Sequence, residues 1–456
     1  MIVNIQNFVY QLGYLFLFKD NYRYLKREYY KIKNDQWKSV DENILLQQER
    51  LFNLIKYAIK FIPYYRNIAK SRNITISRES IFEDILQFPI LTKDIIRENR
   101  NDLHSDLNRY DYIVNTSGGT TGEPIKILQD KTYKARSEAS NILFDEFGNY
   151  HLGDKLIRLW GDESEIINMS KGVFKDIKNK VLKNTIFQNS FKLSEDLIRK
   201  YIVEINREKP KIIIAYVQSI YELAKYIRRK NLHVHSINSI ITSAGVLTEK
   251  MRNFIEETFQ SQVFNRYGSR EVGIIAMSCE NSNLLHLNMH QQYVEILDKD
   301  NKRLEEGRKG NIIITNLHNY LMPLIRYKIG DIGALNYSKC KCGRGTIRLE
   351  NVYGRVVDVF KNSKGDLIDG EYFTHLFYFR EGIKKFQVIQ NEIEHIVIKI
   401  VPQDDQKINK DFEDDIINKI KIVMGKDCKI GFQYVSDIPP PSSGKFRYTI
   451  SNVSKN

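Results

Sequence analysis

The chain has 456 residues and a formal net charge of +14, with 42% hydrophobic and 28% charged residues. This length fits two or three domains, and the apolar content is sufficient for a full core, which excludes a disordered or fibrous protein. The excess of Lys and Arg favours an anionic partner: a nucleotide, a nucleic acid or an acidic membrane surface.

The cysteine count and the first residues indicate the compartment. The four cysteines, Cys279, Cys340, Cys342 and Cys428, are too few for a disulfide scaffold, so we expect a reducing, cytoplasmic location. Residues 1–18 are apolar but lack a basic start and contain several polar side chains, so we expect neither a signal peptide nor a transmembrane segment. This segment either packs on its own domain or makes a peripheral contact with a membrane surface.

The first predicted elements are a helix ending at Pro63 and a series of alternating strands and helices in the middle of the chain. Apolar residues recur at helical spacing over 51–62. Strands are expected at 211–216, 237–242 and 262–265, with helices at 219–229 and after Thr248. This order predicts parallel strands with right-handed crossovers. Ligands lie beyond the carboxyl ends of such strands, where this chain has residues 216–219, 243–245 and 266–271.

The pattern changes at about Gly354. Paired strands over 386–390 and 394–401, a helix through 412–423 and a strand over 429–435 predict a separate α+β unit. We therefore expect an α/β protein with a large N-terminal domain of parallel βαβ sheets over 1–353. A small, mobile C-terminal α+β lid domain would cover 354–456.

The strongest motif is the sequence Asn-Thr-Ser-Gly-Gly-Thr-Thr-Gly-Glu-Pro at 115–124. A loop rich in Gly and hydroxyl groups offers backbone N–H and O–H donors to phosphate oxygens. It is not a Walker A loop, because no Gly-Lys-Ser/Thr follows at the required spacing. The competing interpretation is a hairpin turn with chance Ser and Thr content.

Three weaker motifs follow along the chain. Asp331, after a Gly-containing turn, can accept both hydroxyls of a ribose, and a Gly-Arg segment at 353–358 lies at the expected domain boundary. Lys445 lies on a Gly-containing loop that a closing domain could carry to a phosphate. Taken singly, each has a simpler explanation as a turn residue or a solvated lysine.

The order and spacing of these motifs resemble the adenylate-forming superfamily of acyl-CoA synthetases, nearest to the phenylacetate–CoA ligase and CapK-like capsular polysaccharide branch. The segments Pro63-Tyr64-Tyr65-Arg66 and 386–390 add to the resemblance, which covers nearly the whole chain. It implies activation of a small-molecule carboxylic acid with ATP and Mg²⁺, giving an acyl-adenylate and pyrophosphate. Transfer to CoA, or to another thiol or amine acceptor, would follow, in capsular or other cell-surface polysaccharide biosynthesis.

The resemblance also implies residue roles. Glu271 would bind Mg²⁺, and Lys445 would bridge the attacking carboxylate and the α-phosphate. Cations placed where charge develops offset the repulsion between these two anions. The β- and γ-phosphates would be bound by Ser117, Gly118, Gly119, Thr120, Thr121 and Gly122. The adenine would be bound by Ala244, Gly245, Tyr267 and Gly268, and the ribose by Asp331 with Arg355. Of these, Thr121 would act in catalysis as a hydroxyl donor.

Three positions depart from the family pattern. Val357, followed by Asp358, occupies the hinge position where the family often has Asp or Lys. Arg270 replaces the usual Thr before the motif glutamate, and residues 243–246 lack the Glu often found there. These departures concern the hinge and the acceptor more than the ATP site.

Cysteines and a histidine form a second group of candidate residues. Cys279, His286, Cys340 and Cys342 supply three thiolates and one imidazole, a complete tetrahedral set for structural zinc. Some phenylacetate–CoA ligase-like proteins carry a Cys/His zinc site at matching places. The alternatives are small buried thiols without metal, or His290 as a substitute ligand. Cys428 is expected to be an unrelated core residue.

Two other function classes compete with a ligase. A basic nucleic-acid-binding protein would account for the charge, but Lys and Arg are spread throughout and no base-reading module is recognised, so we expect no nucleic acid partner. A homologue that binds nucleotide without turnover is the other alternative. The presence of Glu271, Asp331, Arg355 and Lys445 favours catalysis over that alternative.

Overall fold

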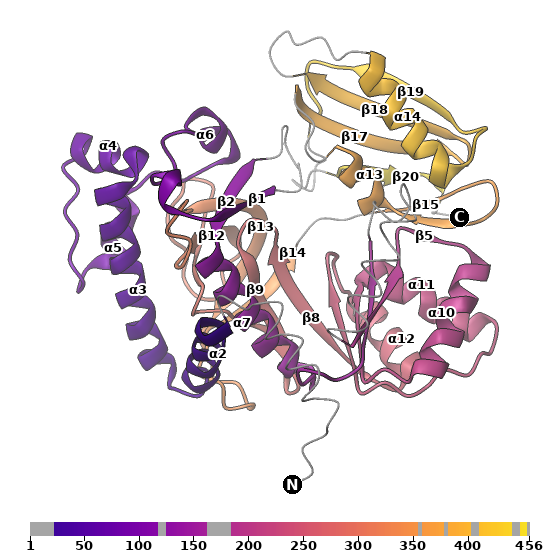
Figure 1. The fold of residues 1–456 in the computed structure, drawn as a ribbon, viewed down its shortest axis with the longest axis horizontal. Coiled ribbons are helices and arrows are strands. Elements are labelled where there is room, and N and C mark those ends of the chain that lie inside the picture. The colour runs from indigo at the N-terminus through magenta and orange to yellow at the C-terminus, as the bar shows by residue number, and fades with distance from the viewer. Residues whose placement is uncertain are drawn as a thin grey trace.

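The computed structural model describes residues 22–116, 125–161, 184–353, 358–377, 382–402, 410–439 and 447–453 (Figure 1). The predicted N-terminal helix is confirmed and begins earlier, because Ser39 and Glu42 form a reciprocal capping box at its start. It ends just before Pro63, which opens the next helix. The N-terminal helices are α2 (Tyr22–Asp35), α3 (Val40–Phe61), α4 (Pro63–Ser71), α5 (Ile81–Asp84) and α6 (Lys93–Glu98).

The largest sheet has eleven strands, and the predicted βαβ series forms its parallel half. Helices α10 (Glu195–Glu208), α11 (Val217–Arg229) and α12 (Glu249–Phe259) share one apolar core with this half, while α7 (Lys131–Phe147) packs in a second core with several of the same strands. The parallel strands are β4 (Thr185–Asn189), β3 (Leu156–Trp160), β6 (Ile212–Tyr216), β7 (Ser239–Ser243) and β8 (Gln262–Ser269), in spatial order.

The predicted α/β fold with parallel βαβ units is confirmed, and the same sheet continues beyond β8 with antiparallel strands that the sequence analysis did not predict. The N-terminal helices pack against this second half and share its core. The antiparallel strands, in spatial order, are β9 (Gly273–Cys279), β10 (Ser282–Leu287), β14 (Arg348–Tyr353), β13 (Tyr327–Asn336), β12 (Gly310–Asn316) and β11 (Gln292–Leu297). A separate hairpin pairs β1 (Tyr112–Thr116) with β2 (Lys126–Asp130).

The C-terminal α+β unit is confirmed and has its own four-stranded sheet. The Gly425 backbone, with φ of +106°, follows the end of its helix, as the sequence predicted. The unit contains α13 (Gly370–Leu376), β17 (Ile383–Glu392), β18 (His395–Pro402), α14 (Lys410–Met424), β19 (Lys429–Tyr434) and β20 (Thr449–Ser451), with strand order β19-β18-β17-β20. Cys428 is buried in its core, as expected.

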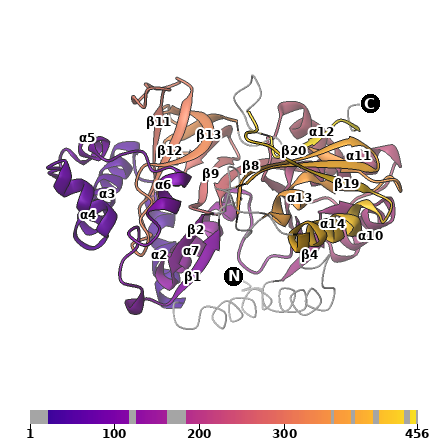
Figure 2. The ribbon, with the colours of Figure 1, turned by 90° about the horizontal axis from the view of Figure 1, so that it is seen from above.

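A small three-stranded sheet joins the two parts of the chain. Strands β15 (Val359–Lys361) and β16 (Leu367–Asp369) extend onto β5 (Lys192–Leu193) of the N-terminal part. Figures 1 and 2 show the C-terminal sheet beside the parallel half of the large sheet. The boundary between residues 353 and 354, and the mobility of the lid, stay predictions.

Within the described part of the chain, no helix is both long enough and apolar enough to cross a membrane. Residues 1–18, for which the sequence suggested packing on the domain or on a membrane surface, lie outside the described residues.

The carboxyl group of Asp369, at the junction of the two parts, should make stability depend on pH. Burial raises its pKa to about 7, and the charges of Glu371 and Glu222 act in the same direction, while hydrogen bonds from the Glu371 backbone and Ser219 oppose the rise. The folded chain therefore binds this proton more tightly than the unfolded chain, whose Asp pKa is about 3.9. The free energy of unfolding consequently falls as the pH rises from about 4 to about 7.

The substitution Asp369→Asn removes this titration while retaining an amide oxygen that can cap α13. The free energy of unfolding of the variant minus that of the parent should therefore increase by about 1–3 kcal/mol from pH 5 to pH 8, since each pKa unit corresponds to about 1.4 kcal/mol. Urea unfolding at the two pH values measures this. An equal difference from the parent at both would contradict the prediction.

Candidate active site and metal centre

Two residues predicted for the nucleotide site lie together although their strands are far apart in the sheet. Tyr267 is on β8 and Asp331 is on β13, with β9, β10 and β14 between them in the strand order. The Tyr267 hydroxyl donates a hydrogen bond to Asp331 Oδ2 at 2.7 Å. The sheet thus curls enough to bring an aromatic ring and a carboxylate to one place.

Glu271 lies just beyond the carboxyl end of β8 and is 3% exposed. The Tyr327 hydroxyl donates to its Oε1 at 3.4 Å, and the Lys93 ammonium lies 3.9 Å from the same oxygen. The Gln129 side-chain amide reaches the Glu271 backbone carbonyl at 3.5 Å. Two separate segments therefore contact the carboxylate predicted to bind Mg²⁺, and a third contacts the backbone of the same residue.

Lys93 is a site residue that the sequence analysis missed. It is the first residue of α6, whose N-cap Thr92 accepts a hydrogen bond from the Ile95 N–H. Leu91, two residues earlier, exchanges backbone hydrogen bonds with Arg326 and Lys328, which places the start of α6 beside the predicted ribose segment. The Thr92 cap was a readable signal for a helix start, but the burial of Lys93 depends on contacts with distant parts of the chain.

A buried ion pair fixes the start of the segment that carries Asp331. The Arg326 guanidinium contacts both carboxylate oxygens of Glu295, at 3.2 and 3.1 Å, and also donates to the carbonyls of Leu86 and Phe88. Burial raises the pKa of Glu295, and Arg326 opposes that rise. The Arg326 backbone has φ of +54°, so this pair stabilises a left-handed turn directly before Tyr327.

The predicted Ser/Thr/Gly loop, with Ser117, Gly118, Gly119, Thr120, Thr121 and Gly122, lies outside the described residues. Its flanks are described: Thr116 pairs with Lys126 at the end of the β1–β2 hairpin. The Asn115 side-chain amide donates to the Arg270 carbonyl at 2.7 Å, which places this hairpin end next to Glu271. The flanks of the loop are therefore at the candidate site.

Ala244 and Gly245 follow β7, the strand that neighbours β8, as predicted. The Ala244 backbone is left-handed, with φ of +56°. A Cβ atom on Gly245 would lie 3.1 Å from Val217 Cβ, so a larger residue would crowd the start of α11. The strand end and the start of α11 therefore approach each other closely. Gly268, on β8, likewise has no room for a side chain, since a Cβ atom would meet the Gly273 carbonyl oxygen at 2.8 Å.

Arg355 and Lys445 also lie outside the described residues, but their neighbours meet. Asp358 accepts a hydrogen bond from the Arg447 guanidinium, and the Ser451 backbone N–H donates to Asp358 Oδ2 at 2.8 Å. The Gly-Arg and Gly-Lys motifs are thus connected through residues only a few positions away from each.

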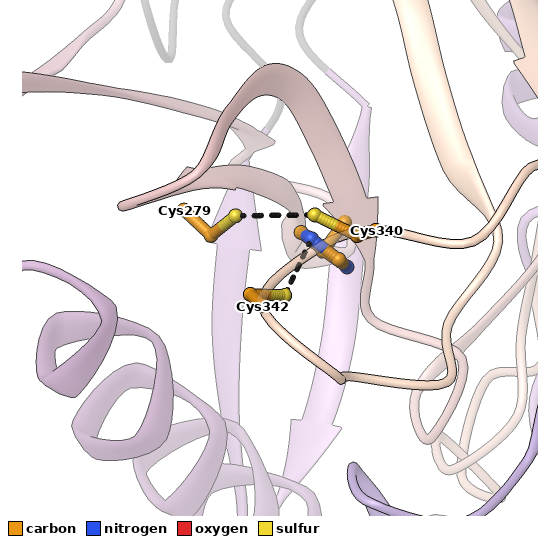
Figure 3. Close-up of side chains that lie close together, drawn as sticks. Cys279, Cys340 and Cys342 are labelled. Carbon is orange, nitrogen blue, oxygen red and sulfur yellow. Dashed lines mark hydrogen bonds between the residues drawn. The ribbon is translucent and has the colours of Figure 1, made fainter.

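The four predicted zinc ligands form one compact cluster, shown in part in Figure 3. Their ligand atoms all lie within 4.8 Å of one another, with Cys279 Sγ 3.6 Å from Cys340 Sγ and Cys342 Sγ 3.4 Å from His286 Nε2. A tetrahedral zinc with bonds of about 2.3 Å to sulfur and 2.0 Å to nitrogen separates its ligands by about 3.5–3.8 Å. The residues therefore fit this ion closely.

The surroundings of the cluster suit a metal in two further ways. Burial lowers the pKa of His286 to about 3, which keeps the ring neutral, and its Nδ1 lies 2.7 Å from Thr346 Oγ1, which orients Nε2 toward the cluster. Burial raises the pKa of the Cys279 thiol to about 12, so a nearby cation is needed to stabilise its thiolate.

His290, the suggested substitute ligand, is elsewhere. It is buried beside Asp35, with 3.9 Å between Nδ1 and Oδ2, and it is not part of the Cys/His cluster found among the described residues. Four ligands leave no open coordination position, so the cluster suits a structural ion and not a catalytic one.

Comparisons with known proteins show which proteins this chain resembles. A model of the CapK C-terminal domain matches residues 360–452. Protein CapK of Staphylococcus aureus is 26% identical over 438 residues, which cover 94% of each chain. A phenylacetate-coenzyme A ligase of Thermus thermophilus is 24% identical and covers 69% of this chain and 70% of its own length.

Solved structures show the same fold. The structure of a 2-hydroxyisobutyryl-CoA ligase with 2-HIB-AMP and CoA, in the thioesterification state, has a TM-score of 0.61, 17% identity and coverage of 91% of each chain. The same enzyme in a postadenylation state has a TM-score of 0.57 and 16% identity, covering 90% of this chain and 89% of its own. Residues 360–452 thus match the CapK C-terminal domain, nearly the whole chain is similar in sequence to CapK and much of it to a phenylacetate-coenzyme A ligase, and its fold is that of the solved CoA ligase.

Proposed function

We propose that the protein activates a carboxylic acid with MgATP, forming an acyl-adenylate and releasing pyrophosphate. The observation that carries this proposal is that Tyr267 and Glu271, at the end of β8, contact residues of the distant strand β13: Tyr267 contacts Asp331 and Glu271 contacts Tyr327. An aromatic ring for adenine, a carboxylate for the ribose and a second carboxylate for Mg²⁺ are the groups that a bound MgATP needs. Carboxylate oxygens are the ligands that Mg²⁺ prefers in proteins.

The cationic groups in this proposal are lysines from opposite ends of the chain. Residues 117–124 contain one Glu and neither Lys nor Arg, so this loop offers the phosphates only hydroxyl and N–H donors. Lys93, beside Glu271, would supply positive charge near the triphosphate. Lys445 would lie between the attacking carboxylate and the α-phosphate, where repulsion between the two anions is greatest. Arg355 would assist Asp331 at the ribose.

The acyl group is then passed to an acceptor. The solved 2-hydroxyisobutyryl-CoA ligase is described with CoA and an acyl-AMP, and the Thermus thermophilus relative is a phenylacetate-coenzyme A ligase, which supports CoA as the acceptor. The role in capsular or other cell-surface polysaccharide biosynthesis is proposed from the resemblance to the CapK-like branch, and the alignment with CapK over 94% of the chain is consistent with that resemblance. The proposal gives the acid and the thiol or amine acceptor by chemical class only.

Zinc is proposed as a structural ion bound by Cys279, His286, Cys340 and Cys342. The loop that carries the last two cysteines is fastened to the N-terminal helices, since the Asn43 amide donates to the Gly345 carbonyl at 2.7 Å. A Cβ atom on Gly345 would lie 1.8 Å from the Lys38 carbonyl oxygen. An ion at this cluster would therefore hold the junction of α2 and α3 to the sheet.

The cellular setting completes the proposal. A cytoplasmic location, the absence of a nucleic acid partner and a peripheral membrane contact through residues 1–18 remain predictions from the sequence. A homologue that binds nucleotide without turnover remains the alternative function, and it would show no exchange of pyrophosphate into ATP with any carboxylic acid.

The substitution Lys445→Ala should abolish adenylate formation while leaving ATP affinity mostly intact, because this lysine acts between the two reacting anions. The measurement is exchange of labelled pyrophosphate into ATP across a panel of carboxylic acids that includes amino acids and sugar acids. ATP binding is measured separately by calorimetry. Near-normal exchange in the variant would remove the proposed role of Lys445.

The substitution Lys93→Met should raise the KM for MgATP in the same exchange assay by about 10-fold or more, because a charge-assisted contact contributes about 1.5–3 kcal/mol. Lys93→Arg keeps the charge and should recover part of the loss. If the Met and Arg variants are impaired equally, charge at this position is not what matters, and Lys93 only packs against Glu271.

The substitution Cys340→Ser should remove zinc, which metal analysis of the purified protein measures. Cys428→Ser is the matched control, because Cys428 is buried in the C-terminal core, away from the cluster. The control should keep the zinc content of the parent, and the cluster variant should also unfold at lower temperature. Equal and negligible zinc in parent and variant would end the zinc proposal.

A further inference from the structure

Phe191, a residue of the N-terminal part, lies in the core of the C-terminal domain. It is located between β4 and β5 and is fully buried in a cluster formed mainly by C-terminal residues, which also includes Tyr216 of the N-terminal part. Its ring meets the Tyr372 ring edge-on, with 5.7 Å between centroids, and the His375 ring with 4.8 Å. Both partners are on α13 of the C-terminal domain.

The backbone around Phe191 reinforces this attachment. The Asp369 N–H donates to the Phe191 carbonyl at 3.0 Å, and two residue pairs then join β5 to β16. Lys192 Nζ lies 3.3 Å from Asp366 Oδ2, on the same side of the junction. Ser219, on α11, donates to Asp369 Oδ2 at 3.3 Å. The contact between the two parts therefore combines apolar packing of the Phe191 ring with hydrogen bonds and an ion pair.

The N-terminal part leaves room for the Phe191 ring in this position. A Cβ atom on Gly161, directly after β3, would lie 1.9 Å from Phe191 Cε1. Behind the ring lies Tyr216, at the carboxyl end of β6, with 6.3 Å between the two centroids. A glycine on one side and aromatic rings on the others thus fix where the ring can lie.

We propose that Phe191 is a positioning residue for the C-terminal domain, holding this domain against β5 in the arrangement described. The inference rests on the proposed function, in which Lys445 of the C-terminal domain meets the nucleotide, and on the predicted mobility of that domain. Each turn would have to withdraw the Phe191 ring from the C-terminal core and separate β5 from β16. The stability of this contact would therefore set how often the domain leaves this arrangement.

Calorimetric unfolding and small-angle X-ray scattering of the full chain test the proposal. The parent should unfold in one transition, because the two parts share a core. Phe191→Ala should split this into two transitions and increase the radius of gyration. Phe259→Ala is the matched control, since Phe259 is equally buried but belongs to the core between α12 and the parallel sheet. It should lower the transition temperature and leave a single transition and an unchanged radius.

A second variant keeps the test decisive if Phe191→Ala does not fold. Gly161→Ala should displace the Phe191 ring, so it should also split the transition, and it should have little further effect in the Phe191→Ala background. If Phe191→Ala or Gly161→Ala behaves like Phe259→Ala, the proposal is wrong. Neither measurement uses ATP, so two transitions in the variants without any pyrophosphate exchange in the parent would overturn only the proposed function.

Discussion

The candidate site depends on the curvature of one mixed sheet. Tyr267 and Asp331 are on strands with three others between them, yet their side chains share a hydrogen bond of 2.7 Å. In the parallel half, α/β connections leave strand ends open to a ligand, and in the antiparallel half a long strand returns a carboxylate to the same place. Strand β8 joins the two halves, because it pairs in parallel with β7 and antiparallel with β9. Any change that flattened the sheet there would separate the groups without altering one of them.

Electrostatics explains why the site is assembled from the whole chain. The Ser/Thr/Gly loop is without basic residues, and in the proposed site Glu271 and Asp331 would add negative charge beside the highly anionic triphosphate of ATP. Lys93 comes from the N-terminal helices and Lys445 from the C-terminal domain. A lysine on a separate domain can contact the carboxylate and the α-phosphate during the reaction and leave both anions solvated before and after it. The buried pair of Arg326 and Glu295 serves the structure instead, since it stabilises the turn before Tyr327.

The sequence predicted those features that depend on local pattern. Buried runs such as 212–216 and the helix cap at Thr248 were readable because periodicity and capping are local properties. The Cys/His set was readable because few residue types bind zinc. The antiparallel half of the sheet was missed, since its strands pair across long distances in the chain. Lys93 and Phe191 were missed for the same reason: each looks ordinary in its own segment and acquires its role from residues more than 150 positions away.

The central claim is that a carboxylate oxygen attacks the α-phosphorus of ATP in the site formed by Tyr267, Asp331 and Glu271. The most direct measurement uses carboxylic acids labelled with ¹⁸O in both oxygens, together with ATP, Mg²⁺ and CoA. One labelled oxygen should remain on AMP after the acyl group has left, which mass spectrometry of the released AMP detects. AMP without label, or no AMP with any acid of the panel, would contradict the account.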